Sequence, residues 1–294
     1  PVRPWRRRGR KAQASAVATI LGLLLVVTFV ANYLTTTLPQ YMSVNDINHN
    51  LLVENEAGRM AALLREASAQ KAVDAQLSQP FVLGSAGLPP FAASDGGAIG
   101  PVLTGSQETV KFGLTGTTPG LVDQVSVGAG VVVQMHNTYA PAAQVAFDYG
   151  AVIFTQYGGI PTMIDPPPIS ITASAATIWL PIFSPLNNTE GGTGTAILQA
   201  TLTAVSTQTF PAGGFTITGG KVTLTLVTPF AAAWMAYFAG SPSFAGDATC
   251  APAGATVCST TGTFINNGAL GTITLLLPVS GVTLTVATFT IGLT

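Results

Sequence analysis

The hydrophobic and polar positions divide the chain into three stretches, and the first two predict a single long helix. A mainly apolar stretch runs from Ala14 to Leu34, and no charged residue occurs between Lys11 and Asp46. Farther along, apolar residues recur at spacings of three and four, which indicates an amphipathic helix. Its apolar face consists of Val44, Ile47, Leu51, Met60, Leu63, Leu64 and Ala67.

The predicted helix covers residues 13–78, with an apolar half at 13–38 and an amphipathic half at 40–78. Pro39 is expected to kink the helix between these halves, because proline lacks an N–H donor and clashes with the preceding turn. Glu56 belongs to the polar positions and is expected on the solvent-facing side of the amphipathic half. The helix should therefore change from apolar on all sides to apolar on one side.

The third stretch, residues 79–294, predicts a domain built from β-strands. Its composition shifts to Gly, Thr, Ala, Val and Pro, and short strand-like runs alternate with turn residues. Alternating residues around Gly219–Gly220 predict one hairpin, and the runs that flank residues 278–281 predict a second. Asp148 is expected at an exposed strand edge. The predicted fold class is α+β, with a long N-terminal hydrophobic α-helix followed by an all-β, sandwich-like head domain.

The charge pattern orients the apolar stretch across a membrane. Six of the 11 lysine and arginine residues lie within residues 1–12, directly before the apolar stretch. Basic residues beside an apolar helix stay on the cytoplasmic side, so the rest of the chain is expected outside the cytoplasm. Three interpretations are open at this point: a cleaved secretory signal, a retained membrane anchor, or a signal that is cut before the apolar stretch.

The junction between the basic and apolar residues favours the third interpretation. The sequence Lys11-Ala12-Gln13, followed by the apolar stretch, resembles the class III signal of archaeal type IV pilins. The resemblance implies that residues 1–12 are a leader, which a prepilin-type peptidase removes between Ala12 and Gln13. A secretory signal would instead end its apolar core at a small-residue cleavage site, and this chain shows no clear site of that kind.

The resemblance covers about the first 65 residues and implies how the helix is used. In pilins, the apolar half packs among identical subunits in a filament core, and the second half lies against its own head. The implied assembly residues are Ala14, Ala16, Ala18, Gly22, Leu23, Leu24, Val27 and Phe29. One position departs from the pattern: many pilins carry Glu at the fifth residue of the processed chain, where this chain has Val17. The departure removes the one charged assembly contact that the resemblance would imply.

These observations predict a structural subunit of an extracellular, cell-surface filament that is inserted in the cytoplasmic membrane before assembly. The expected partners are identical subunits, the membrane and the prepilin-type peptidase. Residues 121–294 carry only five acidic residues and one lysine, whereas about a quarter of the residues in a soluble domain are charged. So few charges suit a surface that neighbours cover. The alternative is a signal-anchored, monomeric surface protein whose head serves binding or adhesion.

Two local features of the head are candidates for covalent modification. Cys250 and Cys258, the only two cysteines, lie across a Gly/Pro-containing loop and are expected to form a disulfide outside the cytoplasm. Asn187 begins an Asn-Asn-Thr sequon in a polar stretch that predicts an exposed loop, so it is a candidate glycosylation site. A glycan there would add solubility to a domain with few charges.

Little in the sequence indicates an enzyme. Two histidines leave little room for a histidine-dependent triad or metal site, and phosphate-loop, nucleophile-elbow and zinc-protease motifs do not occur. The N-terminal basic residues are explained by membrane orientation rather than by nucleic-acid binding. We therefore expect no catalytic residues, cofactor, metal ion or nucleic-acid partner.

Overall fold

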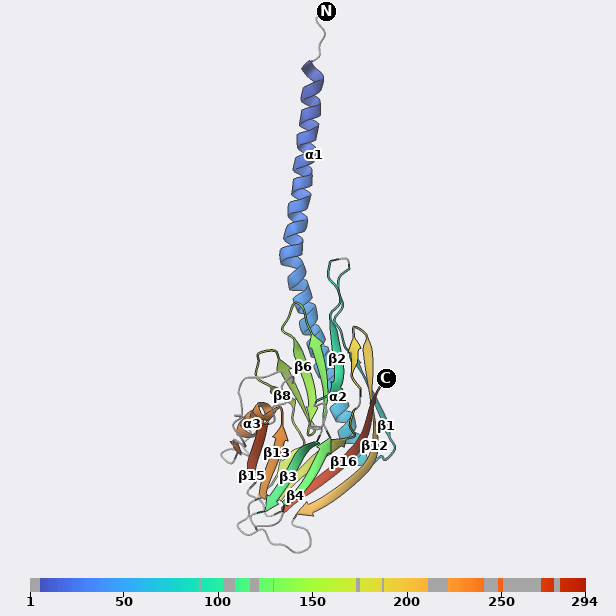
Figure 1. Ribbon diagram of the computed structural model, residues 1–294, viewed down its shortest axis with the longest axis vertical. Helices are drawn as coiled ribbons and strands as arrows, with labels where there is room; N and C mark the ends of the chain where they lie inside the picture. Colours follow the sequence, from blue (N-terminus) through green and yellow to red (C-terminus); the bar gives the residue numbers. More distant parts are fainter. Residues whose placement is uncertain are drawn as a thin grey trace, which may run out of the picture.

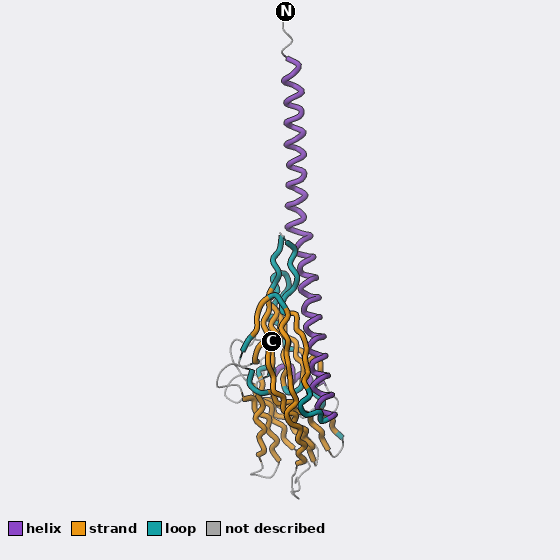
Figure 2. The backbone as a smooth tube through the Cα atoms, turned by 90° about the vertical axis from the view of Figure 1, so that its right-hand side faces the viewer, coloured by secondary structure: helices purple, strands orange, loops and turns teal. Residues whose placement is uncertain are grey.

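The structure, a computed structural model, consists of one long helix and a β-rich head that packs on the C-terminal part of that helix (Figure 1). The N-terminal part of the helix projects away from the head, so the molecule is elongated (Figure 2). The described residues are 6–89, 91–102, 109–116, 122–128, 130–172, 175–186, 188–210, 222–240, 248–250, 271–277 and 281–294.

Three helical segments follow one another without a break. They are α1 (Arg6–Asn32), the π-helical turn η1 (Tyr33–Thr37) and α2 (Leu38–Gln70). The π turn lies just before Pro39, and the N–H of Leu38 bonds to the carbonyl of Tyr33, five residues back. Proline cannot donate to the helix ladder, and a π turn is one way to absorb such a defect. The irregularity expected at Pro39 therefore precedes it, and the helix continues.

The helix ends at Gln70, before the predicted boundary at residue 78. Lys71 adopts the left-handed conformation with φ 51°, and its N–H bonds to carbonyls of the last turn. Shortly afterwards the N–H of Asp74 bonds to the carbonyl of Leu202 at 2.8 Å. Pairing with a strand far along the chain thus ends the helix, and the sequence at this point has no glycine or proline as a local stop signal.

The described part of the head forms three β-sheets (Figure 1). The first sheet has the strand order β1-β12-β16-β10-β9, the second β11-β2-β5-β6-β7-β8, and the third β14-β15-β13-β3-β4. The strands are β1 (Gln76–Val82), β2 (Gly96–Pro101), β3 (Thr109–Gly116), β4 (Val122–Gly128), β5 (Val131–His136), β6 (Ala143–Asp148), β7 (Ala151–Gln156), β8 (Thr162–Asp165), β9 (Ile169–Ile171), β10 (Ala175–Phe183), β11 (Glu190–Gly192), β12 (Thr195–Phe210), β13 (Val222–Thr228), β14 (Ala248–Cys250), β15 (Gly271–Leu277) and β16 (Gly281–Leu293).

Two hydrophobic clusters lie on opposite faces of the second sheet. Alternate residues of its strands point to opposite faces, so Val133 of β5 joins one cluster and Val132 the other. The cluster of Val133 also contains Met60 of α2 and residues of the first sheet. The cluster of Val132 includes Trp234 of the head helix α3 (Ala231–Gly240). The long helix thus packs against two β-sheets, which confirms the predicted α+β class, and the described part of the head adds the helix α3.

The first predicted hairpin lies partly outside the described residues, and the second does not form. Strand β13, which follows Gly219–Gly220, pairs with β15 on one edge and with β3 on the other. Strands β15 and β16, which flank residues 278–280, belong to different sheets. Strand β16 instead runs parallel to β10 and antiparallel to β12. Local alternation identified these strands, but packing of their faces against distant elements selects their partners.

Candidate interaction surface

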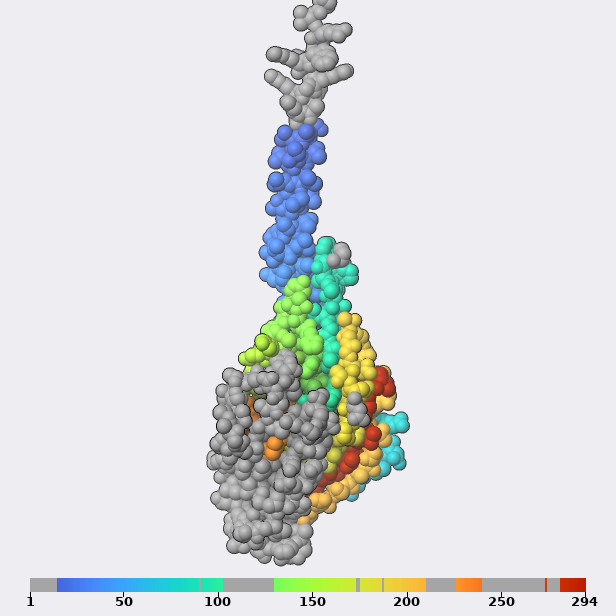
Figure 3. All heavy atoms as spheres, in the orientation of Figure 1, coloured from blue at the N-terminus to red at the C-terminus, as the bar shows by residue number. Residues whose placement is uncertain are grey.

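The helix α1 stands clear of the head, and its apolar side chains are exposed (Figure 3). Leu25 is 71% exposed and Phe29 is 73% exposed, although residues of these types are usually buried in soluble proteins. The helix over Ser15–Gln70 is long and apolar enough to cross a membrane. An exposed apolar surface of this size marks a segment that inserts into a membrane or packs against other apolar segments.

The residues implied in assembly lie on this exposed helix. The exposed residues of this set are Ala16, Ala18, Gly22, Leu23, Leu24, Val27 and Phe29, whereas the side chain of Ala14 lies outside the described residues. A Cβ added at Gly22 would meet no atom within 4 Å. No described residue of the chain therefore requires glycine there, although glycine in a helix interior costs about 1 kcal/mol relative to alanine. Close approach by another helix would supply a reason.

The α2 helix also turns apolar residues away from the head. This outward stripe consists of Tyr41, Val44, Ile47, Leu51 and Leu52, whose spacing places them on one helix face. Val44 is 57% exposed and Leu51 is 51% exposed. The prediction that Val44, Ile47 and Leu51 belong to the face that lies against the head is therefore wrong. An apolar face continues from α1 along the outside of the head-bound part of the helix.

The opposite face of the same helical turns is polar, and it holds the head by hydrogen bonds. Asp46 is fully buried. Its carboxylate accepts hydrogen bonds from the Ser85 hydroxyl at 2.8 Å and from the backbone N–H groups of Tyr139 at 3.0 Å and Ala140 at 3.2 Å. These partners belong to two different loops, so one buried side chain positions both loops on α2.

Two further buried polar residues bind the end of β1. The Nε2 atom of His49 lies 2.8 Å from the carbonyl oxygen of Val82, and the Glu56 carboxylate accepts a hydrogen bond from the N–H of Val82 at 3.2 Å. Glu56 is therefore buried against the head and not on the solvent-facing side, contrary to the prediction. Burial raises the pKa of the Glu56 carboxyl, while the bond from Val82 and a nearby arginine lower it.

Toward the end of α2 the buried face becomes apolar. Val53, Met60 and Leu64 are buried in the cluster that the helix shares with the first and second sheets. Met60, Leu64 and Ala67 lie on the buried face as predicted. Buried polar side chains thus hold the head mainly in the first half of α2, and the larger apolar cluster lies against its second half.

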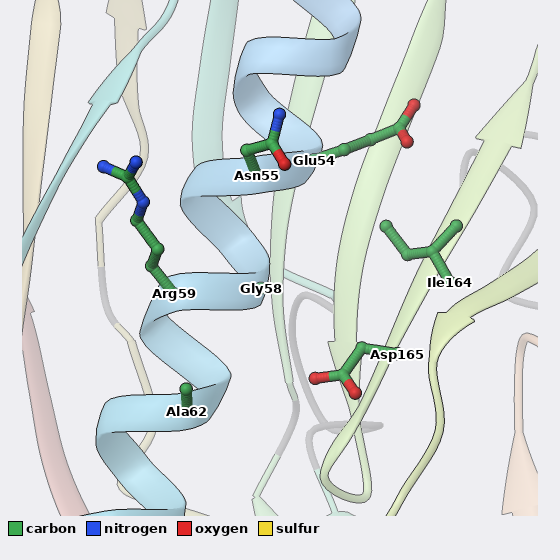
Figure 4. Close-up of a pocket in the computed structure, with 7 residues that line it drawn as sticks. All are labelled: Glu54, Asn55, Gly58, Arg59, Ala62, Ile164 and Asp165. Atoms are coloured by element: carbon green, nitrogen blue, oxygen red, sulfur yellow. The ribbon is translucent and has the colours of Figure 1, made fainter.

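A groove of about 500 Å³ lies between α2 and β8 on the flank of the head (Figure 4). It is lined by Glu54, Asn55, Gly58, Arg59, Ala62, Ile164 and Asp165. Burial raises the pKa of the Glu54 carboxyl. Asp165 is paired with Arg65 at 3.0 Å, and a Cβ at Gly58 would meet no atom within 4 Å. The groove combines charged and small residues, so it can accept a polar group from outside the chain.

A buried carboxyl group links the second sheet to the third sheet and α3. Asp148, at the end of β6, is 3% exposed, so the prediction of an exposed strand edge is wrong. Its Oδ2 atom accepts hydrogen bonds from the Thr228 hydroxyl at 2.5 Å and from the Trp234 indole N–H at 2.8 Å. Burial raises the pKa of the Asp148 carboxyl to about 6, although both hydrogen bonds lower it. Its ionisation is therefore coupled to the stability of the head.

Several predicted sites lie wholly or partly outside the described residues. Lys11-Ala12-Gln13 lie within the backbone of α1, but their side chains are outside the description. Cys250 ends β14, whereas Cys258 lies outside the described residues, so the disulfide stays a prediction. Asn187 is also outside them, so glycosylation stays a prediction too.

Comparison with known protein families, with characterised proteins and with solved structures finds no match for this chain. Among the described residues, no group of three or more His, Cys, Asp or Glu side chains could hold a metal ion. The exposed face of α1 and the outward stripe of α2 are therefore the surfaces from which a function is inferred.

Proposed function

We propose that this chain is the structural subunit of an extracellular, type IV pilus-like filament. It polymerises through its N-terminal apolar helix, with the α1 helices of identical subunits bundled in the core and the heads on the outside. Small residues such as Ala18 and Gly22 let helix backbones approach closely when they leave lipid for a protein core. The resemblance of Lys11-Ala12-Gln13 and its context to a pilin signal supports the same function.

The outward stripe of α2 is the observation that carries this proposal. A simple anchor needs only about 20 apolar residues to cross a bilayer, and residues 14–34 already supply them. Val44, Ile47 and Leu51 lie beyond that length, on the part of the helix that is fixed to the head. Burying one such side chain contributes about 1.5–3 kcal/mol. A neighbouring subunit that covers both α1 and the stripe gains this contribution several times over.

Membrane insertion precedes assembly in this proposal. The basic residues hold the N-terminus on the cytoplasmic side while α1 crosses the bilayer and the head stays outside. A prepilin-type peptidase then cuts between Ala12 and Gln13, and the processed chain leaves the lipid as it joins the filament. The scarcity of charge in residues 121–294 suits a head whose flanks touch other heads.

Shearing cells that produce the protein tests this proposal. We expect filaments in the sheared fraction, and intact-mass measurement should show a chain that begins at Gln13. Gly22→Leu should abolish the filaments, because it adds bulk to the exposed helix. Gly194→Leu is the matched control, because Gly194 also has no atom within 4 Å of an added Cβ but lies in the head. Normal filament abundance from Gly22→Leu would contradict the packing of α1.

The groove between α2 and β8 favours the second candidate, a signal-anchored, monomeric surface protein that binds a ligand or mediates adhesion. Its Glu54, Arg59 and Asp165 side chains offer charges of both signs, and the small residues Gly58 and Ala62 line the groove between them. In that case the chain keeps residues 1–12 and remains in the membrane fraction after shearing. The same mass measurement therefore separates the two functions.

A further inference from the structure

One loop of the head reaches farther along the helix toward the N-terminus than the rest of the head (Figures 1 and 2). The loop joins β1 to β2 and spans residues 83–95. At its tip, the N–H groups of Phe91 and Ala92 bond to the carbonyl of Leu88 at 2.8 and 2.9 Å. The N–H of Leu88 bonds back to the carbonyl of Ala92 at 3.0 Å. These bonds hold Leu88 and Ala92 together at the tip.

Contacts with α2 fix the position of this tip along the helix axis. The side-chain amide of Asn45 donates a hydrogen bond to the carbonyl of Ala86 at 2.7 Å. Leu38 and Met42 of α2 are buried in a small cluster with Ala92. Hydrogen bonds at the base and apolar contacts near the turn thus hold the loop alongside the beginning of α2.

The tip presents an apolar side chain at its outer end. The Phe91 ring packs edge-on against the Tyr33 ring with 6.3 Å between the centroids, yet Phe91 is 51% exposed. Residues 75–94 carry no charged side chain. The loop therefore brings an uncharged, aromatic surface to the point where the helix leaves the head.

The length of the apolar stretch places this point relative to a bilayer. Residues 14–34 span about 30 Å at 1.5 Å per residue, which is the thickness of the hydrocarbon core. With the basic residues on the cytoplasmic side, Tyr33 falls at the outer boundary of that core. Phe91 touches Tyr33, so it falls in the interfacial layer, where aromatic side chains are enriched in membrane proteins.

We propose that the tip of the 83–95 loop is a lipid-contacting foot, with Phe91 inserted among the headgroups of the outer leaflet beside Tyr33. The foot holds the head in one orientation against the membrane before assembly. A lipid surface is the partner because the tip is uncharged, apolar and continuous with the segment that enters the hydrocarbon. The inference rests on the membrane insertion of α1, which the proposed function includes, and not on polymerisation.

Fluorescence quenching in lipid nanodiscs tests the foot. The full-length chain is reconstituted at one copy per disc, with acyl chains brominated close to the headgroup. Phe91→Trp adds a tryptophan at the tip, and Tyr157→Trp adds one at an exposed position between β7 and β8 as the control. After subtraction of the wild-type signal, the tryptophan at position 91 should lose about half of its emission. The control should lose none.

Three other results would overturn the foot in distinguishable ways. Equal quenching of the two variants in discs that contain the chain would overturn the foot alone. A blue shift of the emission from position 91 that requires two copies per disc would assign the tip to a second chain. Failure of the wild-type chain to enter discs would overturn the membrane insertion of α1, and with it both this inference and the membrane stage of the proposed function.

Discussion

The two faces of α2 differ in a way that a soluble monomer would not favour. The face toward the head carries buried polar residues, among them Asp46 and His49, whereas the outward face carries exposed Val44 and Leu51. Each buried polar group is specific about its partner, so the inward face fixes the position of the helix on the head. The outward apolar face has no comparable role inside the chain. The comparison teaches that the inward face is satisfied within the monomer, by hydrogen bonds and by apolar core contacts such as those of Met60, whereas the outward apolar face is left for contacts beyond the monomer.

Charges on the outward stripe should have the largest effect. The double variant Val44→Asp and Leu51→Asp places two carboxylates where a neighbouring helix is expected, and burial of an unpaired charge is strongly unfavourable. We expect at least about a tenfold loss of sheared filament mass, with the midpoint of thermal unfolding in detergent unchanged to within about 3 °C. Normal filaments would show that the stripe is not a subunit contact.

Truncating one apolar residue on each face sharpens the comparison. Met60 is fully buried, so Met60→Ala should lower the free energy of unfolding by about 3–4 kcal/mol. Leu51→Ala removes a similar side chain from the outward stripe and should change the free energy of unfolding by less than about 0.5 kcal/mol. Denaturant titration of both variants in detergent measures the difference. Similar losses would mean that Leu51 is part of the monomer core.

The free energy of unfolding should depend on pH through a buried group of the head, because the outward stripe carries no ionisable carboxyl or amine. The folded Asp148 carboxyl has a pKa of about 6, above its ordinary value of about 4, so the folded state binds the proton more tightly than the unfolded state. The contribution of Asp148 to the free energy of unfolding is therefore fully present below about pH 4, and about 3 kcal/mol of it is lost as the pH rises through 6.

The variant Asp148→Asn tests the assignment of this pH dependence. Asparagine keeps an oxygen that can accept from Thr228 and Trp234 but does not ionise, so the loss of stability between about pH 4 and pH 7 should largely disappear. Unfolding curves for both proteins across this range provide the measurement. An unchanged pH dependence in the variant would assign the effect to another group.

The smallest expected change concerns the inward hydrogen bonds. Asp46→Asn keeps the shape of the side chain but replaces one acceptor by a donor, so at least one bond from Ser85, Tyr139 or Ala140 is lost. We expect a loss of about 1–2 kcal/mol in the free energy of unfolding. Asn48→Asp, on the exposed side of the same helical turn, is the control and should have little effect. Equal stability of Asp46→Asn and the wild type would show that Asp46 does not help to hold the head on α2.

The sequence predicted the elements better than their contacts. The 3.6-residue period and the apolar stretch identified the long helix, because these signals are local. The same period suggested that Val44, Ile47 and Leu51 face the head, since apolar residues usually point to the core. It missed that Asp46 and His49 find partners 33 to 94 residues away, in two loops and at the end of β1.

In the head, too, local patterns predicted the elements but not their contacts. Alternation identified β13, β15 and β16 as strands, but it also predicted a hairpin of β15 with β16 that does not form, because partner choice depends on distant faces. Asp148 was expected to be exposed because it is charged and lies beside a turn. Its burial depends on Thr228 and Trp234, which are 80 and 86 residues away along the chain, so no local signal could have shown it.

Electron cryomicroscopy of material sheared from producing cells tests the central claim most directly. The account predicts filaments in which α1 lies in a helical core and the outward stripe, from Tyr41 to Leu52, contacts the helix of a neighbouring subunit. The heads should lie outside that core with their inward α2 contacts intact. A preparation without filaments, in which the chain stays in the membrane as a monomer with its basic residues attached, would contradict the account.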